Sequence, residues 1–142
     1  MPPLERHALL RPVSREHHEG LLFCWQVRQA LAQALDPMAQ MRIGSEFYHR
    51  HLLPHFGIEE EAVFPVLGAK DPLVERAIRE HRRLTHLFLN TDDPIYALSR
   101  IGVELEAHIR FEERVLFQRV QEVASEAQLE WIDRLHGLMK DE

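Results

Sequence analysis

The chain has 142 residues, enough for one domain with its own core. Its 17 Lys and Arg against 23 Asp and Glu give a net charge of −6, which disfavours a nucleic-acid partner because duplex binding needs a basic surface. Hydrophobic residues make up 45% and charged residues 28%, as in ordinary globular proteins. No apolar stretch approaches the roughly 20 residues of a bilayer crossing, so we expect no membrane partner either.

The single cysteine, Cys24, excludes an internal disulfide. Residues 1–20 carry charges where a signal peptide needs an apolar core. We therefore expect a cytoplasmic, reducing location, with Cys24 as a small core residue. The oligomeric state is left open. The unusual feature of the composition is histidine, which occurs 10 times.

Three Asp-Pro pairs, at Asp36, Asp71 and Asp93, mark predicted helix starts. Asp is a strong N-cap, and Pro suits the first helical position because the N–H that it lacks would be unpaired there. Ser14 and Ser125 are candidate caps of two more helices, and Gln128 completes a capping box with Ser125. The predicted helices cover residues 14–35, 37–67, 72–90, 94–121 and 125–140.

Gly68 and Asn90 stand where C-terminal caps belong, and the connections are short, so consecutive helices should be antiparallel neighbours. The expected fold is all-α: an up-down antiparallel four-helix bundle over residues 14–121 with an additional C-terminal helix over 125–140, forming a single domain 1–142. An interior proline removes a hydrogen bond and clashes with the preceding turn, so Pro54 predicts a kink, with a second one at Gly57.

An internal repeat relates the second and fourth predicted helices. Both contain the pattern His-x-x-x-Glu-Glu, which begins at His55 in one and at His108 in the other. Residues four apart lie one above the other on a helix, so each histidine converges with the first glutamate of its motif, Glu59 or Glu112. Both pairs share their helix face with apolar residues and should point into the core. Burying ionised carboxylates beside histidines is costly unless a cation compensates, and metal ions would do so.

The first and third predicted helices each offer a histidine on the apolar face, His17 and His81. The adjacent His18 lies about 100° away at the edge of that face, so the periodicity favours His17 while His18 stays a candidate ligand. An imidazole and carboxylate set suits iron, manganese or zinc. Ferritin-like proteins use paired Glu-x-x-His motifs instead, and the single match here, at Glu46 and His49, is interpreted as accidental.

With these motifs the sequence resembles the hemerythrin-like family, the bacterial HHE cation-binding domains. The resemblance spans residues 14–120 and rests on four motifs in order: Glu16-His17-His18, His55-Phe-x-x-Glu59-Glu60, Glu80-His81 and His108-x-x-x-Glu112-Glu113. It implies a non-haem centre with two iron ions, bridged by Glu59 and Glu112 and held by the terminal ligands His17, His55, His81 and His108.

The chain departs from the family's oxygen carriers at one position. Those proteins have a second histidine four residues after the ligand of the third helix, where this sequence has Thr85, and His86 points off the face. The departure favours reactivity with oxygen, nitric oxide or peroxide, or iron sensing, over simple oxygen carriage.

Several positions near the motifs are candidate supporting residues. His51 and Glu104 stand one turn before His55 and His108, where each could orient an imidazole or serve as an extra ligand. Tyr48 and Thr85 could donate hydrogen bonds near the site. The remaining polar residues of interest are interpreted as solvated or without signal: Glu60, Glu113, His7 and His136.

The leading hypothesis is therefore a non-haem di-iron protein that binds or reacts with a small molecule (oxygen, nitric oxide or peroxide), or senses iron or oxygen. Two alternatives stay open: a metal-binding sensor or storage module without catalysis, and a purely structural helical bundle. The sequence does not distinguish an enzyme from a binding protein.

Overall fold

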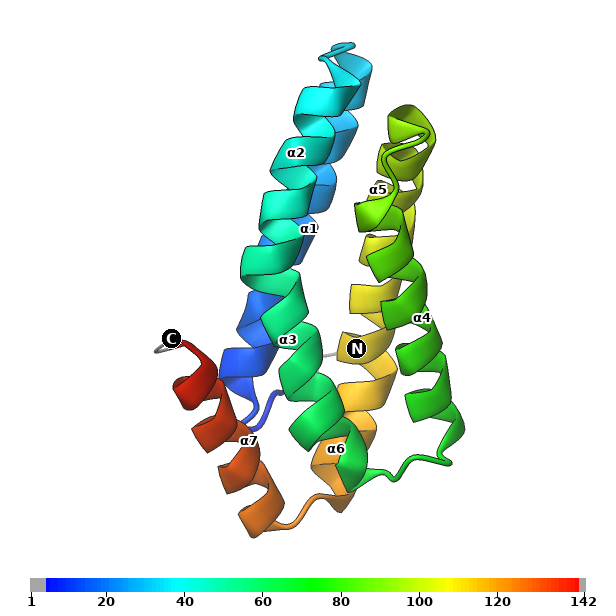
Figure 1. Ribbon diagram of the computed structural model, residues 1–142. Helices are drawn as coiled ribbons and strands as arrows, with labels where there is room; N and C mark the ends of the chain where they lie inside the picture. Colours follow the sequence, from blue (N-terminus) through cyan, green and yellow to red (C-terminus); the bar gives the residue numbers. More distant parts are fainter. Residues whose placement is uncertain (1–4, 141–142) are drawn as a thin grey trace.

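The computed structural model describes residues 5–140, and helices account for most of them (Figure 1). No strand occurs within residues 5–140, so the prediction of an all-α protein is confirmed. Several segments join end to end into continuous rods. The segments are α1 (Arg11–Ala32), α2 (Pro37–Phe47), a π-helical turn (Tyr48–Leu52), α3 (Leu53–Ile58), a second π-helical turn (Glu59–Val63), a 3₁₀ turn (Phe64–Val66), α4 (Pro72–Leu89), α5 (Pro94–Phe111), a third π-helical turn (Glu112–Leu116), α6 (Phe117–Val123) and α7 (Glu126–Lys140).

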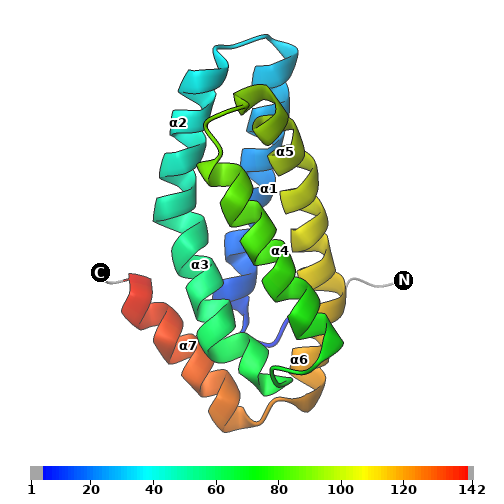
Figure 2. The same ribbon diagram turned by 45° about the vertical axis from the view of Figure 1, so that its right-hand side comes forward.

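Successive rods run in opposite directions along one long axis (Figures 1 and 2). In chain order these are α1, then α2 with α3, then α4, then α5 with α6. Helix α5 packs against both α1 and α4. Helix α7 lies outside this group, at the lower end of the view, where it contacts α1 and α3. None of the helices in the described part of the chain is long and apolar enough to span a membrane.

The predicted helix starts at the Asp-Pro pairs are confirmed. The carboxylates of Asp36, Asp71 and Asp93 each accept a hydrogen bond from a backbone N–H in the first turn of α2, α4 or α5. The capping box of α7 is also present, because Ser125 and Gln128 exchange two hydrogen bonds of 2.9 and 3.1 Å between side chain and backbone. These local signals are strong because the partners lie within one turn of each other.

The predicted cap of the first rod is wrong, and the predicted kink of the second lies at a local change of helix type. Ser14 does not cap α1, which begins at Arg11; its hydroxyl instead donates to the carboxylate of Glu113 on another helix. Pro54, the predicted site of a kink, lies just after a departure from regular α-helix. A π-helical turn precedes it, in which the N–H of Leu53 bonds to the carbonyl of Tyr48, and this wider turn accommodates the proline ring while the rod continues through Gly57 (Figure 1).

The apolar core forms two clusters that share the same helices at different heights. One contains Phe23, Phe88 and Leu105, and the other contains Phe64 and Phe117. Cys24 is fully buried in the first cluster, as predicted, and burial raises the pKa of its thiol to about 12. Along every main rod, one stretch between the two clusters carries buried polar side chains in place of apolar ones.

Candidate metal centre

Six polar side chains are buried in the described part of the chain, and all six meet in the layer between the apolar clusters. Both carboxylates have no exposed surface. Each carboxylate lies at the start of a π-helical turn, a local feature frequent at functional sites. The six are His17 of α1, His55 of α3, His81 of α4, His108 of α5, and the glutamates Glu59 and Glu112.

Short distances join the imidazoles and carboxylates in the first half of this layer. His17 Nε2 lies 3.0 Å from Glu112 Oε1, and His55 Nε2 lies 3.4 Å from Glu59 Oε2. The Nε2 atoms of His17 and His55 are 3.1 Å apart. These four side chains form one group whose donor atoms all lie within 4.8 Å of one another.

The second half repeats the pattern of the first. His81 Nε2 lies 3.1 Å from Glu59 Oε1, and His108 Nε2 lies 3.3 Å from Glu112 Oε2. These four side chains form the second group of possible metal ligands, again within 4.8 Å. Both groups contain Glu59 and Glu112, so the two carboxylates face both pairs of histidines.

The positions of the donor atoms suit bonds to a metal ion better than hydrogen bonds to one another. Within the described residues, both oxygens of Glu59, Glu112 Oε2 and the Nε2 atoms of His81 and His108 are buried and make no hydrogen bond of good geometry. Orphaned buried polar atoms are costly and need a partner. Two ligands at right angles on a metal with bonds of about 2.1 Å lie about 3 Å apart, which matches the separations in this layer.

An outer ring of carboxylates surrounds the four imidazoles, one at each Nδ1. The inner nitrogens thus face the centre while the outer ones face a glutamate, an arrangement that orients metal-bound histidines in proteins. The pairs are His55 with Glu16 at 3.0 Å, His81 with Glu60 at 2.8 Å, His108 with Glu80 at 2.8 Å, and His17 with Glu113 at 3.5 Å.

The interpretation of Glu60 and Glu113 as solvated side chains is therefore wrong. Each points away from the histidine of its own helix but contacts a histidine of a neighbouring helix. Glu60 reaches His81 of α4, and Glu113 reaches His17 of α1. The glutamates before His17 and His81 act in the same way across helices. A usable signal was present in the sequence, since each of the four motifs contains one glutamate beyond those needed as inner ligands: Glu16, Glu60, Glu80 and Glu113.

The charges of this layer stabilise one another. Burial disfavours the charged form of His55, but the carboxylates of Glu59 and Glu16 outweigh burial and raise the pKa of this imidazole to about 10. The pKa of His108 rises to about 9 because Glu112 and Glu80 likewise outweigh burial. Burial of Glu112 is outweighed by its histidine neighbours, which hold the pKa of this carboxyl well below its usual range. The layer is thus built to keep negative carboxylates beside positive charge.

Other residues proposed from sequence lie apart from the six. His18 is exposed on α1, outside both groups of possible metal ligands, because it falls on the outer side of the helix. Glu104 does not orient His108; it pairs with Arg83 at 3.0 Å and Arg100 at 2.8 Å on the surface. Glu80, from the neighbouring helix, takes the place predicted for Glu104.

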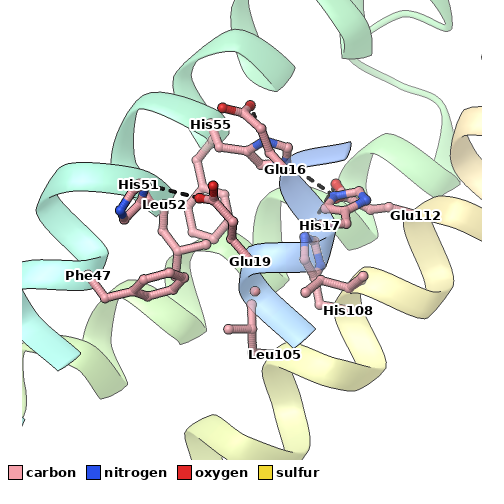
Figure 3. A pocket seen from close by; sticks show the side chains of 13 residues that line it. Glu16, His17, Glu19, Phe47, His51, Leu52, His55, Leu105, His108 and Glu112 are labelled. Carbon is pink, nitrogen blue, oxygen red and sulfur yellow. Dashed lines mark hydrogen bonds and ion pairs between the residues drawn. The ribbon is translucent and has the colours of Figure 1, made fainter. Parts of the chain in front are cut away.

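Tyr48, Thr85 and His51 lie near the layer without entering it. The hydroxyl of Tyr48 donates to Thr85 Oγ1 at 3.0 Å, so the two side chains satisfy each other. His51 Nδ1 pairs with Glu19 at 3.1 Å, where both side chains reach the surface. Figure 3 shows this pair on the side of the cavity away from His17 and Glu112.

A small cavity adjoins the first half of the layer (Figure 3). His17, His55 and His108 contribute to its polar wall. The cavity has a volume of about 10 Å³ and has room for one water-sized molecule. The remaining wall is mostly apolar and includes Phe47, Leu52, Phe56, Leu105 and Ile109.

The fold and the buried layer agree with a comparison to known protein families. The chain matches the hemerythrin HHE cation-binding domain over residues 8–120 and belongs to that family. The predicted resemblance is thereby confirmed, and a cation-binding function follows for the buried histidine and glutamate layer. Neither the curated proteins nor the solved structures compared with the chain contain a significant match.

Proposed function

We propose that the chain binds two iron ions in the buried layer and uses them to bind, sense or react with a small molecule such as oxygen, nitric oxide or peroxide. In this proposal Glu59 and Glu112 bridge the ions, while one ion takes His17 and His55 and the other takes His81 and His108. An up-down bundle of four helical rods supplies the ligands, and α7 is an addition to it. The observation that carries the proposal is the pair of ligand groups that share both carboxylates.

Iron bound here would supply a redox-active centre with coordination positions that the protein does not fill. The residues of the chain would provide the rest of the site. The outer carboxylates would accept the Nδ1–H of His55, His81 and His108, which fixes the tautomer and leaves Nε2 free to bind. Manganese and zinc suit the same ligand types, so metal availability also decides which ion is bound.

The cavity supports a small and weakly polar ligand. It opens beside His17 and His55, its volume suits a molecule of two or three atoms, and apolar side chains form much of its wall. Thr85 supports reactivity over simple carriage, since a threonine paired with Tyr48 stands where the family's oxygen carriers have another imidazole. A purely structural role would leave both buried carboxylate oxygens of Glu59 without a hydrogen bond or a metal bond.

Metal analysis of protein purified without a histidine tag tests this proposal. We expect two irons per chain, and an absorption spectrum in air that changes when azide is added. Glu59→Gln should lose most of the iron, whereas the matched change Glu61→Gln, at an exposed position two residues away, should keep both ions. One ion per chain, or only zinc after growth in iron-replete medium, would overturn the di-iron assignment. Repeated turnover of peroxide or nitric oxide with a reductant would separate an enzyme from a sensor or storage protein.

A further inference from the structure

Helix α7 lies outside residues 8–120, the part of the chain that matches the family, yet it reaches the metal layer. His136 Nε2 lies 3.4 Å from Glu16 Oε1, within ion-pair distance but without the geometry of a hydrogen bond. The same oxygen of Glu16 lies 3.0 Å from His55 Nδ1. The side chains of His136 and Glu16 are 14% and 15% exposed, so this contact is largely removed from water. A chain of contacts therefore runs from α7 to a histidine of the centre.

The two Glu-His motifs, Glu16-His17 and Glu80-His81, allow this contact to be compared with its counterpart in α4. Glu80 is the counterpart of Glu16, and it orients His108 as Glu16 orients His55. Glu80 is held by Arg76, which stands four residues before it on the same helix and donates to its second oxygen at 3.0 Å. Four residues before Glu16 the sequence has Pro12, which has no side-chain donor. Position 12 of α1 therefore has no counterpart of the arginine that contacts Glu80 in α4.

His136 is held firmly enough to take over that role. Leu129 and Ile132 of α7 are buried in the core cluster that contains Phe64 and Phe117, and Leu135 and Met139 pack against this cluster. His136 follows Ile132 by four residues, so it lies on the same face of α7 and is directed toward the bundle. An anchored helix can fix a neighbouring carboxylate because its side chains lose little further freedom on making the contact.

We propose that His136 is a positioning residue of the metal centre: α7 fixes Glu16, which holds His55 in the orientation that binds metal. The inference rests on the proposed di-iron function. It gives two histidines of the centre support of different origin, because Glu80, which orients His108, is held from within α4. Glu16, which orients His55 beside the cavity, is held from α7.

Release of Fe(II) to a chelator, measured anaerobically on the full chain, tests this role. Loss of an outer partner of a metal-bound histidine lowers metal affinity about 10- to 100-fold. His136→Ala should therefore bind two ions but release one of them about 10-fold faster than the wild type does, with the second ion unchanged. His136→Arg should restore slow release, since it offers Glu16 the donor that Arg76 offers Glu80. His49→Ala, at an exposed histidine of the second rod, is the matched control and should change nothing.

A double-mutant cycle tests whether the effect passes through Glu16. His136→Ala should have no further effect on release once Glu16 is changed to Ala. Equal acceleration of both ions, or unchanged release in a His136→Ala protein with a normal circular dichroism spectrum, would overturn the positioning role while leaving the di-iron proposal intact. Wild-type protein that binds fewer than two ions would overturn both. A His136→Ala chain that fails to fold, while His136→Arg folds and releases one ion rapidly, would also count against the role.

Discussion

Each histidine of the buried layer uses both ring nitrogens, and the two nitrogens meet carboxylates of different kinds. Nε2 of His81 faces the fully buried Glu59, while its Nδ1 faces the half-exposed Glu60 at 2.8 Å. Two adjacent glutamates of one helix therefore serve the inner and outer sides of the centre. The outer contact fixes the ring without withdrawing a donor from the metal. The doubled Glu of the motif has a physical reason in the proposed centre: the first glutamate would bind the metal, and the second contacts a histidine of a neighbouring helix.

The first prediction at this scale distinguishes His17 from His18. His17 lies 3.0 Å from Glu112 and is 5% exposed, whereas its neighbour is exposed. His17→Ala should remove most of the metal from at least one half of the centre, and His18→Ala should leave two ions per chain. Metal analysis of both purified variants measures the difference. Loss of metal from His18→Ala with retention in His17→Ala would contradict the placement of α1.

The second prediction concerns Thr85, which lies four residues after His81 and accepts a hydrogen bond from Tyr48. Thr85→His would place a second imidazole on the same helix face, where it could fill an open position on one iron. The variant should keep both irons, form a longer-lived oxygen adduct and lose peroxide or nitric oxide turnover. Stopped-flow absorption spectroscopy measures both reactions.

Thr85→Val is the control for this change. It removes the acceptor of the Tyr48 hydroxyl, which should cost about 1 kcal/mol of stability, and should leave the metal content unchanged. If Thr85→His kept wild-type reactivity and Thr85→Val were also silent, the difference from the family's oxygen carriers would have no functional meaning.

At the scale of elements, the end of α1 shows a strained residue. Ala34 has a φ of 53°, in the left-handed region that favours glycine. Its backbone completes a Schellman motif, in which the N–H of Leu35 bonds to Ala30 and the N–H of Ala34 bonds to Leu31, at 3.0 and 3.1 Å. This motif ends α1 at Ala32, three residues before the predicted end.

Ala34→Gly should stabilise the protein by about 1 kcal/mol, because a left-handed conformation costs an alanine roughly 1–2 kcal/mol that glycine avoids. Ala34 is exposed, so no core contact is lost. Ala32→Gly is the matched control: it is also exposed but is the last helical residue of α1, where glycine should destabilise by up to about 0.5–1 kcal/mol. Urea unfolding measures both. Equal destabilisation by the two changes would mean that the left-handed conformation of Ala34 does not lower the free energy of unfolding.

Features that depend on contacts within one turn could be predicted from the sequence. The Asp-Pro caps and the Ser125–Gln128 box are of this kind, as is the inward face of His55 with Glu59, because helical periodicity fixes them. Ser14 was misassigned because its hydroxyl has a partner on a distant helix, Glu113, and such a contact has no local signature.

Features that depend on how helices pack could not be predicted. The outer glutamates contact histidines of neighbouring helices, and His136 reaches Glu16 from a segment 120 residues away in the chain. Pro54 correctly predicted a departure from regular α-helix. The form of that departure, a π-helical turn in a rod with core residues on both sides of the proline, depends on packing. Spacing within a helix shows which face is buried, but it does not show which neighbour covers that face.

At the scale of the whole molecule, a layer of charge divides the apolar core into two clusters. Such a layer stabilises the bundle only while its carboxylates are compensated. Without metal, protonated imidazoles provide the positive charge, as the raised pKa values of His55 and His108 indicate. With metal, the same imidazoles must be neutral in order to bind, so loading should release protons. The imidazoles therefore compensate the carboxylates in the metal-free protein, and the metal ions compensate them in the loaded protein.

The stability of the metal-free and the loaded protein should consequently depend on pH in different ways. A histidine whose pKa is raised by folding contributes stability that is complete below about pH 6.5, its unfolded value, and is lost as pH rises through the folded value. For His108 and His55 these folded values are about 9 and about 10. The melting temperature of the metal-free protein should therefore fall from pH 7 to pH 9.5, whereas the loaded protein, with no titrating imidazole in the layer, should change less.

Removing metal should thus lower the melting temperature at every pH in this range, and by more at pH 9.5 than at pH 7. Differential scanning calorimetry of loaded and chelator-treated protein measures the gap, with His18→Ala as a control that should follow the wild type because this histidine lies outside the layer. A pH-stat titration at pH 7 should also record the release of at least two protons per chain when metal is added, since His55 and His108 are protonated there before loading. A gap that narrows as pH rises, or metal binding without proton release, would show that the metal-free layer is not held together by imidazolium and carboxylate charges.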